Sequence, residues 1–354
     1  MKTDMNVLLE MLTTRQASDL HISANAPPKI RIDERLINAT NEMLYPEDTK
    51  TLAYSILSKE QITTFERNKE LDLSFEVAKR GRFRVNVFLQ RGSVGIAVRL
   101  VPFEIMNFEQ CGLPVDVVTS FCRRPKGLVL VTGATGMGKS TSLASMVDFI
   151  NAERDCHIVT VEDPIEFVHS NKKAVIDQRE VHYDTLSFGA ALKHVLRQDP
   201  DVILIGEMRD LETIESALII AETGHLVFAT LHTSDSVQTI NRVIDVFPAY
   251  QQAQIRTQLS FVLLGVLSQQ LIPKKGTIGR VLATEVLVVN PAIRSLVRES
   301  KIHQVYSNMQ TGSREGMRTM NQSLYEVHKK GLISYEECFA RSTDTEDLAR
   351  LFKK

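Results

Sequence analysis

Cysteine is scarce in this sequence, and the spacing of its four cysteines excludes a tetracysteine zinc module. Cys111, Cys122, Cys156 and Cys338 include no Cys-x-x-Cys pair, which a tetracysteine zinc module requires. A chain of 354 residues is also long enough to bury a core without disulfides. The simplest interpretation is a set of reduced thiols, as in a cytosolic protein.

Long hydrophobic runs are absent as well. The longest, Phe261–Leu267, has seven residues, whereas a membrane-spanning helix needs about 20. The segment Met1–Glu10 carries Lys2 and Asp4 and lacks the apolar region of a signal peptide. We therefore expect a soluble, cytoplasmic protein that contacts a membrane only through a partner.

Neither sign of charge is in excess. The 42 Lys and Arg residues nearly balance 43 Asp and Glu residues, which gives a formal net charge of −1. Because there is also no basic, aromatic-rich stretch, we expect no nucleic acid among the partners. Hydrophobic residues make up 43% and charged residues 24% of the chain, which is typical of a globular protein and excludes disordered and fibrous classes.

The hydrophobic patterning predicts an α/β protein of more than one domain. Residues 1–105 combine short amphipathic helices with alternating strands, including an antiparallel hairpin. After them come four continuous apolar runs separated by helical patterns, which predict a parallel sheet covered on both faces. These runs are Leu128–Thr132, Ile158–Val161, Val202–Ile205 and Leu226–Leu231.

We assign the domain boundaries from changes in composition. A first domain covers 1–105, a linker 106–115, an α/β core 116–290 and a helical C-terminal region 291–354. Within the core, Leu267–Ile272 and Val281–Val288 predict an added hairpin.

A phosphate-binding loop follows the first apolar run and precedes a predicted helix. Gly133-Ala134-Thr135-Gly136-Met137-Gly138-Lys139-Ser140 matches G-x-x-x-x-G-K-[ST] at every defined position. The glycines let backbone N–H groups face phosphate oxygens, and the helix N-terminus adds a positive dipole end. We expect Lys139 to reach the β- and γ-phosphates, Ser140 to hold Mg²⁺, and Thr141 to complete the nucleotide site. A chance glycine-rich turn would not stand in register with both a strand and a helix.

Acidic and histidine side chains follow the next three runs, at the sheet edge where ligands bind. Glu162 ends one run, Glu207 follows the next after Gly206, and His232 follows the third. We expect Glu162 to activate the attacking water as a general base, Glu207 to hold Mg²⁺ through a water, and His232 to sense the γ-phosphate. The two glutamates could exchange roles, or serve as helix caps or surface ion pairs. His225 fits a structural role as well as a functional one.

Together these motifs resemble those of the secretion ATPases of the type II secretion and type IV pilus superfamily. The first part of the chain is similar to the twitching-motility branch, the type IV pilus retraction ATPases, so the resemblance covers essentially the whole chain. The segments that carry it are Ser18–Ile22, Arg82–Asn86, Gly133–Ser140, Val161–Glu166, Leu204–Asp210 and Thr223–Thr233.

Two features favour retraction over assembly within that superfamily. The long N-terminal extension and the zinc module usual in assembly and type II secretion ATPases are absent. In addition, Ala292-Ile293-Arg294-Ser295-Leu296-Val297-Arg298-Glu299 resembles the retraction signature Ala-Ile-Arg-Asn-Leu-Ile-Arg-Glu, with conservative departures at Ser295 and Val297. The same stretch also fits an amphipathic surface helix whose Ile293, Leu296 and Val297 dock on a neighbour, while Arg294 and Arg298 stay polar.

The resemblance implies a homohexameric ring that binds ATP and Mg²⁺ between a PAS-like first domain and a RecA-like second domain. In the family, arginines of the first domain reach the phosphates; the matching candidates are Arg84 and Arg99, with Arg91 a third. The implied motor works in the cytoplasm at the inner-membrane base of the pilus, where it pulls on a platform protein and retracts the fibre.

Four other functions stay open at this point. An accessory retraction paralogue shares most of the motifs, and a pilus assembly or secretion motor shares many. A nucleic-acid translocase belongs to a different class that also uses RecA-like hexamers, although the balanced charge argues against it. A nucleotide-gated adaptor would bind ATP without turning it over.

Overall fold

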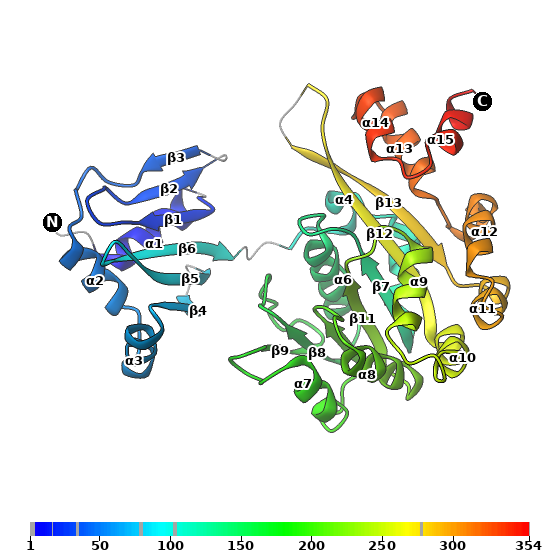
Figure 1. Ribbon diagram of the computed structural model, residues 1–354, viewed down its shortest axis with the longest axis horizontal. Coiled ribbons are helices and arrows are strands. Elements are labelled where there is room, and N and C mark those ends of the chain that lie inside the picture. Colours follow the sequence, from blue (N-terminus) through cyan, green and yellow to red (C-terminus); the bar gives the residue numbers. More distant parts are fainter. Residues whose placement is uncertain are drawn as a thin grey trace. The chain divides into compact units, whose positions relative to one another are not determined.

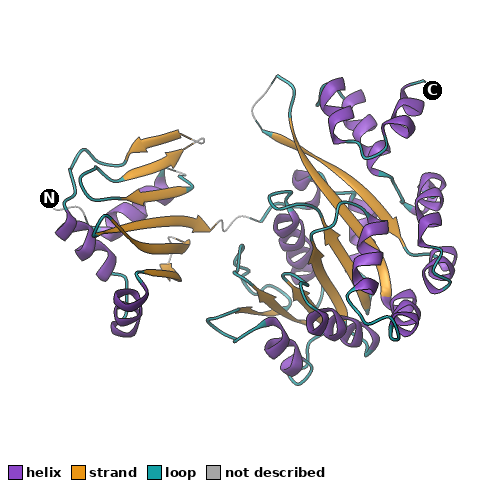
Figure 2. Cartoon of the chain, viewed as in Figure 1, coloured by secondary structure: helices purple, strands orange, loops and turns teal. Residues whose placement is uncertain are grey.

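The computed structural model describes residues 4–15, 17–32, 35–77, 81–101, 105–276 and 279–353. The chain forms two compact units, Met1–Glu104 and Ile105–Lys354, each with its own sheet (Figures 1 and 2). The fold is therefore mixed α/β, as the patterning predicts.

The described part of the smaller unit is a six-stranded antiparallel sheet with three helices. The strand order is β3-β2-β1-β6-β5-β4. The elements, in chain order, are α1 (Met5–Thr14), β1 (Asp19–Ile22), β2 (Lys29–Ile32), β3 (Arg35–Asn38), α2 (Pro46–Tyr54), α3 (Lys59–Asn68), β4 (Glu70–Val77), β5 (Gly81–Gln90) and β6 (Ser93–Val101).

Alternation along these strands gives the smaller unit its core. Leu20 and Ile22 of β1 and Phe83 and Val85 of β5 are buried, together with the apolar side of α1. Asp4 caps α1 by accepting a hydrogen bond from the Asn6 backbone N–H, as expected for a helix N-terminus.

The larger unit contains a seven-stranded sheet in the order β13-β12-β7-β11-β10-β8-β9. All neighbouring strands are parallel except β12 and β13. The elements up to the end of this sheet are α4 (Phe108–Cys111), α5 (Val115–Cys122), β7 (Gly127–Thr132), α6 (Lys139–Glu153), β8 (His157–Glu162), β9 (Val175–Glu180), α7 (Phe188–Val195), β10 (Val202–Ile205), α8 (Leu211–Glu222), β11 (Leu226–Leu231), α9 (Ser236–Asp245), α10 (Gln252–Val262), β12 (Leu263–Pro273) and β13 (Arg280–Val288).

Helices cover both faces of this sheet, which explains its continuous apolar strands. Every residue of β7, β10 and β11 is buried. One face packs against α5 and α6, and the other against α7, α8, α9 and α10 (labelled in Figure 1). The phosphate-binding loop follows β7, a central strand, so its position is fixed by the core on both sides.

The chain becomes helical after β13. The described helices of this end are α11 (Pro291–Arg298), α12 (Val305–Thr311), α13 (Met320–Lys329), α14 (Tyr335–Arg341) and α15 (Thr345–Phe352), with short 3₁₀ turns at Ile302–Gln304 and Ser313–Glu315. Helices α13, α14 and α15 share a separate apolar cluster (Figure 1). Nowhere in the described ranges is there a helix both long and apolar enough to span a membrane.

Most predicted elements are present, and the four apolar runs are the parallel strands β7, β8, β10 and β11. Two strands were missed, β3 and β9. The segment 106–115, expected to be a linker, contains α4, whose Phe108 ring lies 5.0 Å from that of Phe149 in α6. This segment therefore packs on the core of the larger unit.

Candidate active site

The phosphate-binding loop joins β7 to α6 with a backbone that requires glycine. Gly133, Gly136 and Gly138 have φ values of 140°, 80° and 83°, a region that side chains with a Cβ rarely adopt. A Cβ on Gly133 would also lie 2.6 Å from the carbonyl oxygen of Gln269. The motif glycines thus allow both the turn and the close approach of β12.

The N-terminus of α6 has no side-chain cap, so its backbone N–H groups can bind an anion. Its N-cap is Gly138, so no side chain caps the helix, and its first N–H groups have no partners within the helix. In contrast, α7, α8 and α9 are capped by Ser187, Asp210 and Asp235. Unpaired N–H groups and the positive dipole end at α6 fit the phosphates of a nucleotide.

The hairpin formed by β12 and β13 donates hydrogen bonds to the phosphate-binding loop. The Leu271 N–H donates to Met137 Sδ (3.2 Å), and Arg280 donates to the Gly136 carbonyl (3.4 Å). Deeper in the core, Gln269 donates to the Ser142 hydroxyl in α6 (2.6 Å). The added hairpin therefore fixes the shape of the loop.

Lys139, the first residue of α6, points its ammonium back into the loop. Its Nζ donates to the carbonyls of Gly133 (2.7 Å) and Ala134 (3.1 Å), and the residue is 9% exposed. Burial lowers the pKa of Lys139, and the charge of Glu207 partly offsets this. The cation is thus held where the loop would wrap phosphate oxygens.

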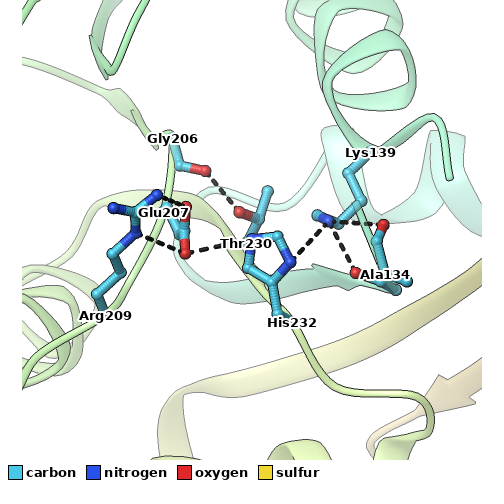
Figure 3. A network of polar contacts seen from close by, with 8 residues as sticks. Ala134, Lys139, Gly206, Glu207, Arg209, Thr230 and His232 are labelled. Atoms are coloured by element: carbon cyan, nitrogen blue, oxygen red, sulfur yellow. Dashed lines mark hydrogen bonds and ion pairs between the residues drawn. The ribbon is translucent and has the colours of Figure 1, made fainter. Parts of the chain in front are cut away.

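A chain of polar contacts leads from Lys139 across the strand ends (Figure 3). Lys139 Nζ lies 3.5 Å from His232 Nδ1, and His232 Nε2 lies 3.2 Å from Glu207 Oε1. Because an ammonium can only donate, Nδ1 is the acceptor, and Nε2–H is then the donor to Glu207. The imidazole therefore links the phosphate-binding lysine to the carboxylate of Glu207.

Arg209 holds the other side of Glu207. Its Nε and Nη2 each lie 2.8 Å from a different carboxylate oxygen, a bidentate arrangement. Burial alone would raise the pKa of Glu207, but the hydrogen bonds and charge of Arg209, together with the hydrogen bond from His232, outweigh burial and lower it. Glu207 is thus kept ionised next to the loop.

Backbone and side-chain bonds align the three strand ends that carry these groups. The Thr230 hydroxyl donates to the Gly206 carbonyl (2.5 Å), and the Gly206 N–H donates to the Val161 carbonyl (2.8 Å). A Cβ on Gly206 would approach Glu162 Cα to 3.2 Å. Glycine in this slot therefore lets β10 and β8 end side by side.

Glu162 lies at the end of β8 and forms hydrogen bonds with residues other than those that contact Lys139, His232 and Glu207. Its Oε1 accepts from the Thr160 hydroxyl (2.7 Å) and from Gln178 Nε2 (3.1 Å). Burial raises the pKa of Glu162 more than these hydrogen bonds lower it. A carboxylate with a raised pKa at a strand end is suited to accept a proton.

The structure brings some of the expected site residues into contact and places others apart. Lys139, Glu207 and His232 are in contact, and Glu162 ends the adjacent strand. His225 precedes β11, at the opposite end of that strand from His232, and its Nδ1 lies 3.1 Å from the Ile220 carbonyl, which fits a structural role.

The arginine candidates lie in the smaller unit. Arg84 and Arg99 are directly opposite in β5 and β6, and Arg99 Nε donates to Asp19 (2.8 Å) while its side chain stays 64% exposed. Arg91 occupies the two-residue turn between β5 and β6 with φ of 49°. Its place in that turn separates Arg91 from the other two.

One expectation for the segment 292–299 is wrong. It forms α11 and the turn that follows, but Ile293 and Val297 are 0% and 1% exposed and pack in the core of their own unit. They are therefore not available to dock on a neighbour. Ala292, Arg298 and Glu299 are exposed, and Arg294 and Leu296 are half-buried.

Sequence reasoning missed the residues that support the site. Arg209, Thr230, Thr160 and Gln178 all contact a predicted functional group or its strand. The spacing of Thr160 two residues before Glu162 was the one available signal, because alternate strand residues share a face. The contacts of the others depend on how the strands pair.

Comparisons with known proteins agree on one family. The family model described as "Type II/IV secretion system protein" matches residues 1–340. The type IV pilus retraction ATPase PilT of Pseudomonas aeruginosa is 49% identical, over 94% of this chain and 96% of its own length. The twitching motility protein of Neisseria gonorrhoeae is 45% identical, over 91% of this chain and 86% of its own.

A solved structure agrees with these relatives. The crystal structure of the pilus retraction motor PilT with bound ADP superimposes with a TM-score of 0.91 at 51% identity, and the match covers 98% of each chain. Sequence and fold therefore indicate the same group of proteins over nearly the full length.

Proposed function

The chain belongs to the type II/IV secretion ATPase family and, within it, to the type IV pilus retraction ATPases, and we propose from this premise that it hydrolyses ATP to retract a pilus in twitching motility. The observation that carries the proposal is the contact of Lys139 in the phosphate-binding loop with His232, and of His232 with Glu207.

In this proposal the loop residues Gly133–Ser140, with Thr141, bind the phosphates of ATP. Lys139 replaces its carbonyl contacts with contacts to the β- and γ-phosphate oxygens. His232 senses the γ-phosphate through the same ring that contacts Glu207. Glu162 takes the proton from the attacking water, which makes the water a better nucleophile.

Mg²⁺ fits the oxygen ligands at this place. The exposed Ser140 hydroxyl and the Glu207 carboxylate are oxygen ligands of the kind that Mg²⁺ prefers. Bound there, the ion would neutralise charge on the phosphates. Glu207 would act through a water, since Arg209 already donates to both of its oxygens.

At the level of domains, we propose a PAS-like unit over 1–105, a RecA-like core over 116–290 and a helical region over 291–354, with the connecting segment 106–115 packed on the core. The support for the first boundary is the division of the chain into two compact units, each with its own sheet. Arg84 and Arg99 would supply positive charge to the phosphates from the PAS-like unit.

At the level of assembly, we propose a homohexamer in the cytoplasm at the inner-membrane base of the pilus. Its partner there is the platform protein, and α11 with its exposed Arg298 and Glu299 transmits the motion. The support is membership of the retraction ATPases.

Phosphate release by the purified protein tests the enzymatic part. We expect wild type to release phosphate from Mg-ATP, and Glu162→Ala to bind ATP without releasing it. No release by wild type under conditions where it binds ATP would favour a nucleotide-gated adaptor instead.

A further inference from the structure

Two neighbouring side chains hold the same oxygen of Glu162. The Thr160 hydroxyl donates to Glu162 Oε1 at 2.7 Å, and Gln178 Nε2 donates to it at 3.1 Å. Thr160 and Glu162 are two apart in β8, so they lie on one face of the sheet. Gln178 in β9 is paired directly with Thr160. The three side chains therefore meet on one face by strand geometry.

The hydroxyl of Thr160 donates its hydrogen atom to Glu162 and is buried. The residue is 0% exposed, and a buried hydroxyl without a partner is costly. Of the hydrogen bonds described for its side chain, the one to Glu162 accounts for its donor. Valine has the same branched shape as threonine and would fit this buried strand position equally well, so packing alone does not account for the hydroxyl.

The side-chain amide of Gln178 is hydrogen-bonded both to Glu162 and to the loop that follows β8. Besides Glu162, its Nε2 donates to the Phe167 carbonyl (2.9 Å), and its Oε1 accepts from the His169 N–H (2.8 Å). One side chain thus bonds both the carboxylate and the loop that follows it. Movement of Glu162 would break a network, not a single bond.

We propose that Thr160 and Gln178 are positioning residues that fix the carboxylate of Glu162 in one orientation toward the attacking water. The proposal rests on the proposed role of Glu162 as general base. Two donors on one oxygen restrict the carboxylate to one rotamer, which matters because a general base must lie within hydrogen-bond reach of its proton. They also favour the ionised form, against the effect of burial on the pKa of Glu162.

Two substitutions at Thr160 separate positioning from packing. Thr160→Val keeps the shape and removes the donor, whereas Thr160→Ser keeps the donor and removes a methyl group. We expect Thr160→Val to lower kcat roughly 10- to 100-fold, as for a lost hydrogen bond to a charged group, with unchanged ATP affinity and unchanged Tm. Thr160→Ser should keep kcat within about twofold and lower Tm.

The reverse pattern would overturn the proposal. If Thr160→Val turned over ATP normally, or if Thr160→Ser lost as much rate as Thr160→Val, the hydroxyl would not position the base. Gln178→Met supplies a second variant, since it keeps the size of the side chain without adding a charge next to Glu162, and lacks the donor. It should lower kcat without weakening ATP binding; a loss of ATP binding instead would mean that Gln178 acts only by holding the loop.

A coupling experiment distinguishes failure of this inference from failure of the proposed function. In a Glu162→Gln background, Thr160→Val should cause no further loss in the single-turnover rate, because its effect acts through Glu162. An equal further loss would show an independent structural role and overturn the inference alone. If Glu162→Gln by itself left kcat unchanged, the general-base assignment would fail, and the inference with it.

Discussion

At the scale of single residues, the ammonium of Lys139 is bonded to neutral groups. Its partners are two backbone carbonyls and an imidazole nitrogen, and it is buried. Phosphate oxygens would be stronger partners for this cation because they carry charge. The lysine is therefore ready to exchange its partners when nucleotide enters the loop.

Lys139→Ala should fold normally and lose nucleotide binding. A charged hydrogen bond contributes about 1.5–3 kcal/mol, so we expect ATP affinity to fall at least about tenfold. Isothermal titration of Mg-ATP checks the affinity, and the rise in Tm on adding Mg-ATP should disappear. Lys193→Ala, at an exposed position of α7, is the control. Wild-type affinity in Lys139→Ala would contradict the assignment of the loop.

The sequence predicted the site to the extent that strand ends could be located. Lys139, Glu207 and His232 follow three apolar runs, and the parallel sheet brings them into contact. The bidentate bond from Arg209 to Glu207 was not predictable, because it depends on the path of the loop after β10. For the same reason the sequence left open which glutamate is the base.

At the scale of elements, two glycines of the phosphate-binding loop differ in what surrounds them. A Cβ on Gly133 would lie 2.6 Å from the Gln269 carbonyl, whereas a Cβ on Gly136 would meet nothing within 4 Å. Both have positive φ, so both carry a backbone cost of about 1–2 kcal/mol on substitution.

We therefore expect Gly133→Ala to lower the free energy of unfolding by clearly more than Gly136→Ala. The excess comes from displacing β12, which the added methyl would contact. Midpoints of urea unfolding measure both variants. Equal losses would mean that β12 does not approach the loop as described.

Helix α11 separates a structural side from a polar side. Ile293 and Val297 are buried, whereas Arg298 is exposed. We expect the double change Arg294→Ala with Arg298→Ala to spare ATP hydrolysis and to abolish motility. Ile293→Ala should instead lower the free energy of unfolding by about 2–5 kcal/mol. Loss of hydrolysis in the double variant would assign α11 to the catalytic or folding machinery.

Elements with strong patterns were predictable, and two short strands were not. In β3 (Arg35–Asn38) the two apolar residues, Leu36 and Ile37, are adjacent, so the strand shows no alternation of apolar and polar residues; all four residues are exposed. In β9 the polar residues Asp177, Gln178 and Arg179 interrupt the pattern, because this strand lies at the sheet edge. Pairing with a neighbouring strand, which the sequence does not display, determines both.

At the scale of the whole molecule, the proposed catalysis needs both units. Arg99 is exposed but bonded to Asp19. We expect Arg99→Ala to keep ATP binding and to lose about 10³-fold or more in kcat, as for other arginine fingers. Asp19→Asn, which removes the charged partner and leaves the arginine, should keep most activity. Normal turnover in Arg99→Ala would remove this residue from the mechanism.

The central claim is that ATP hydrolysis by this chain retracts a pilus. The most direct measurement is pilus display and surface motility in cells that lack the chain, complemented with wild type or with Lys139→Ala. We predict abundant pili without motility in the deletion strain, and recovery with wild type only. Cells without pili would contradict the account, because the motor would then extend fibres.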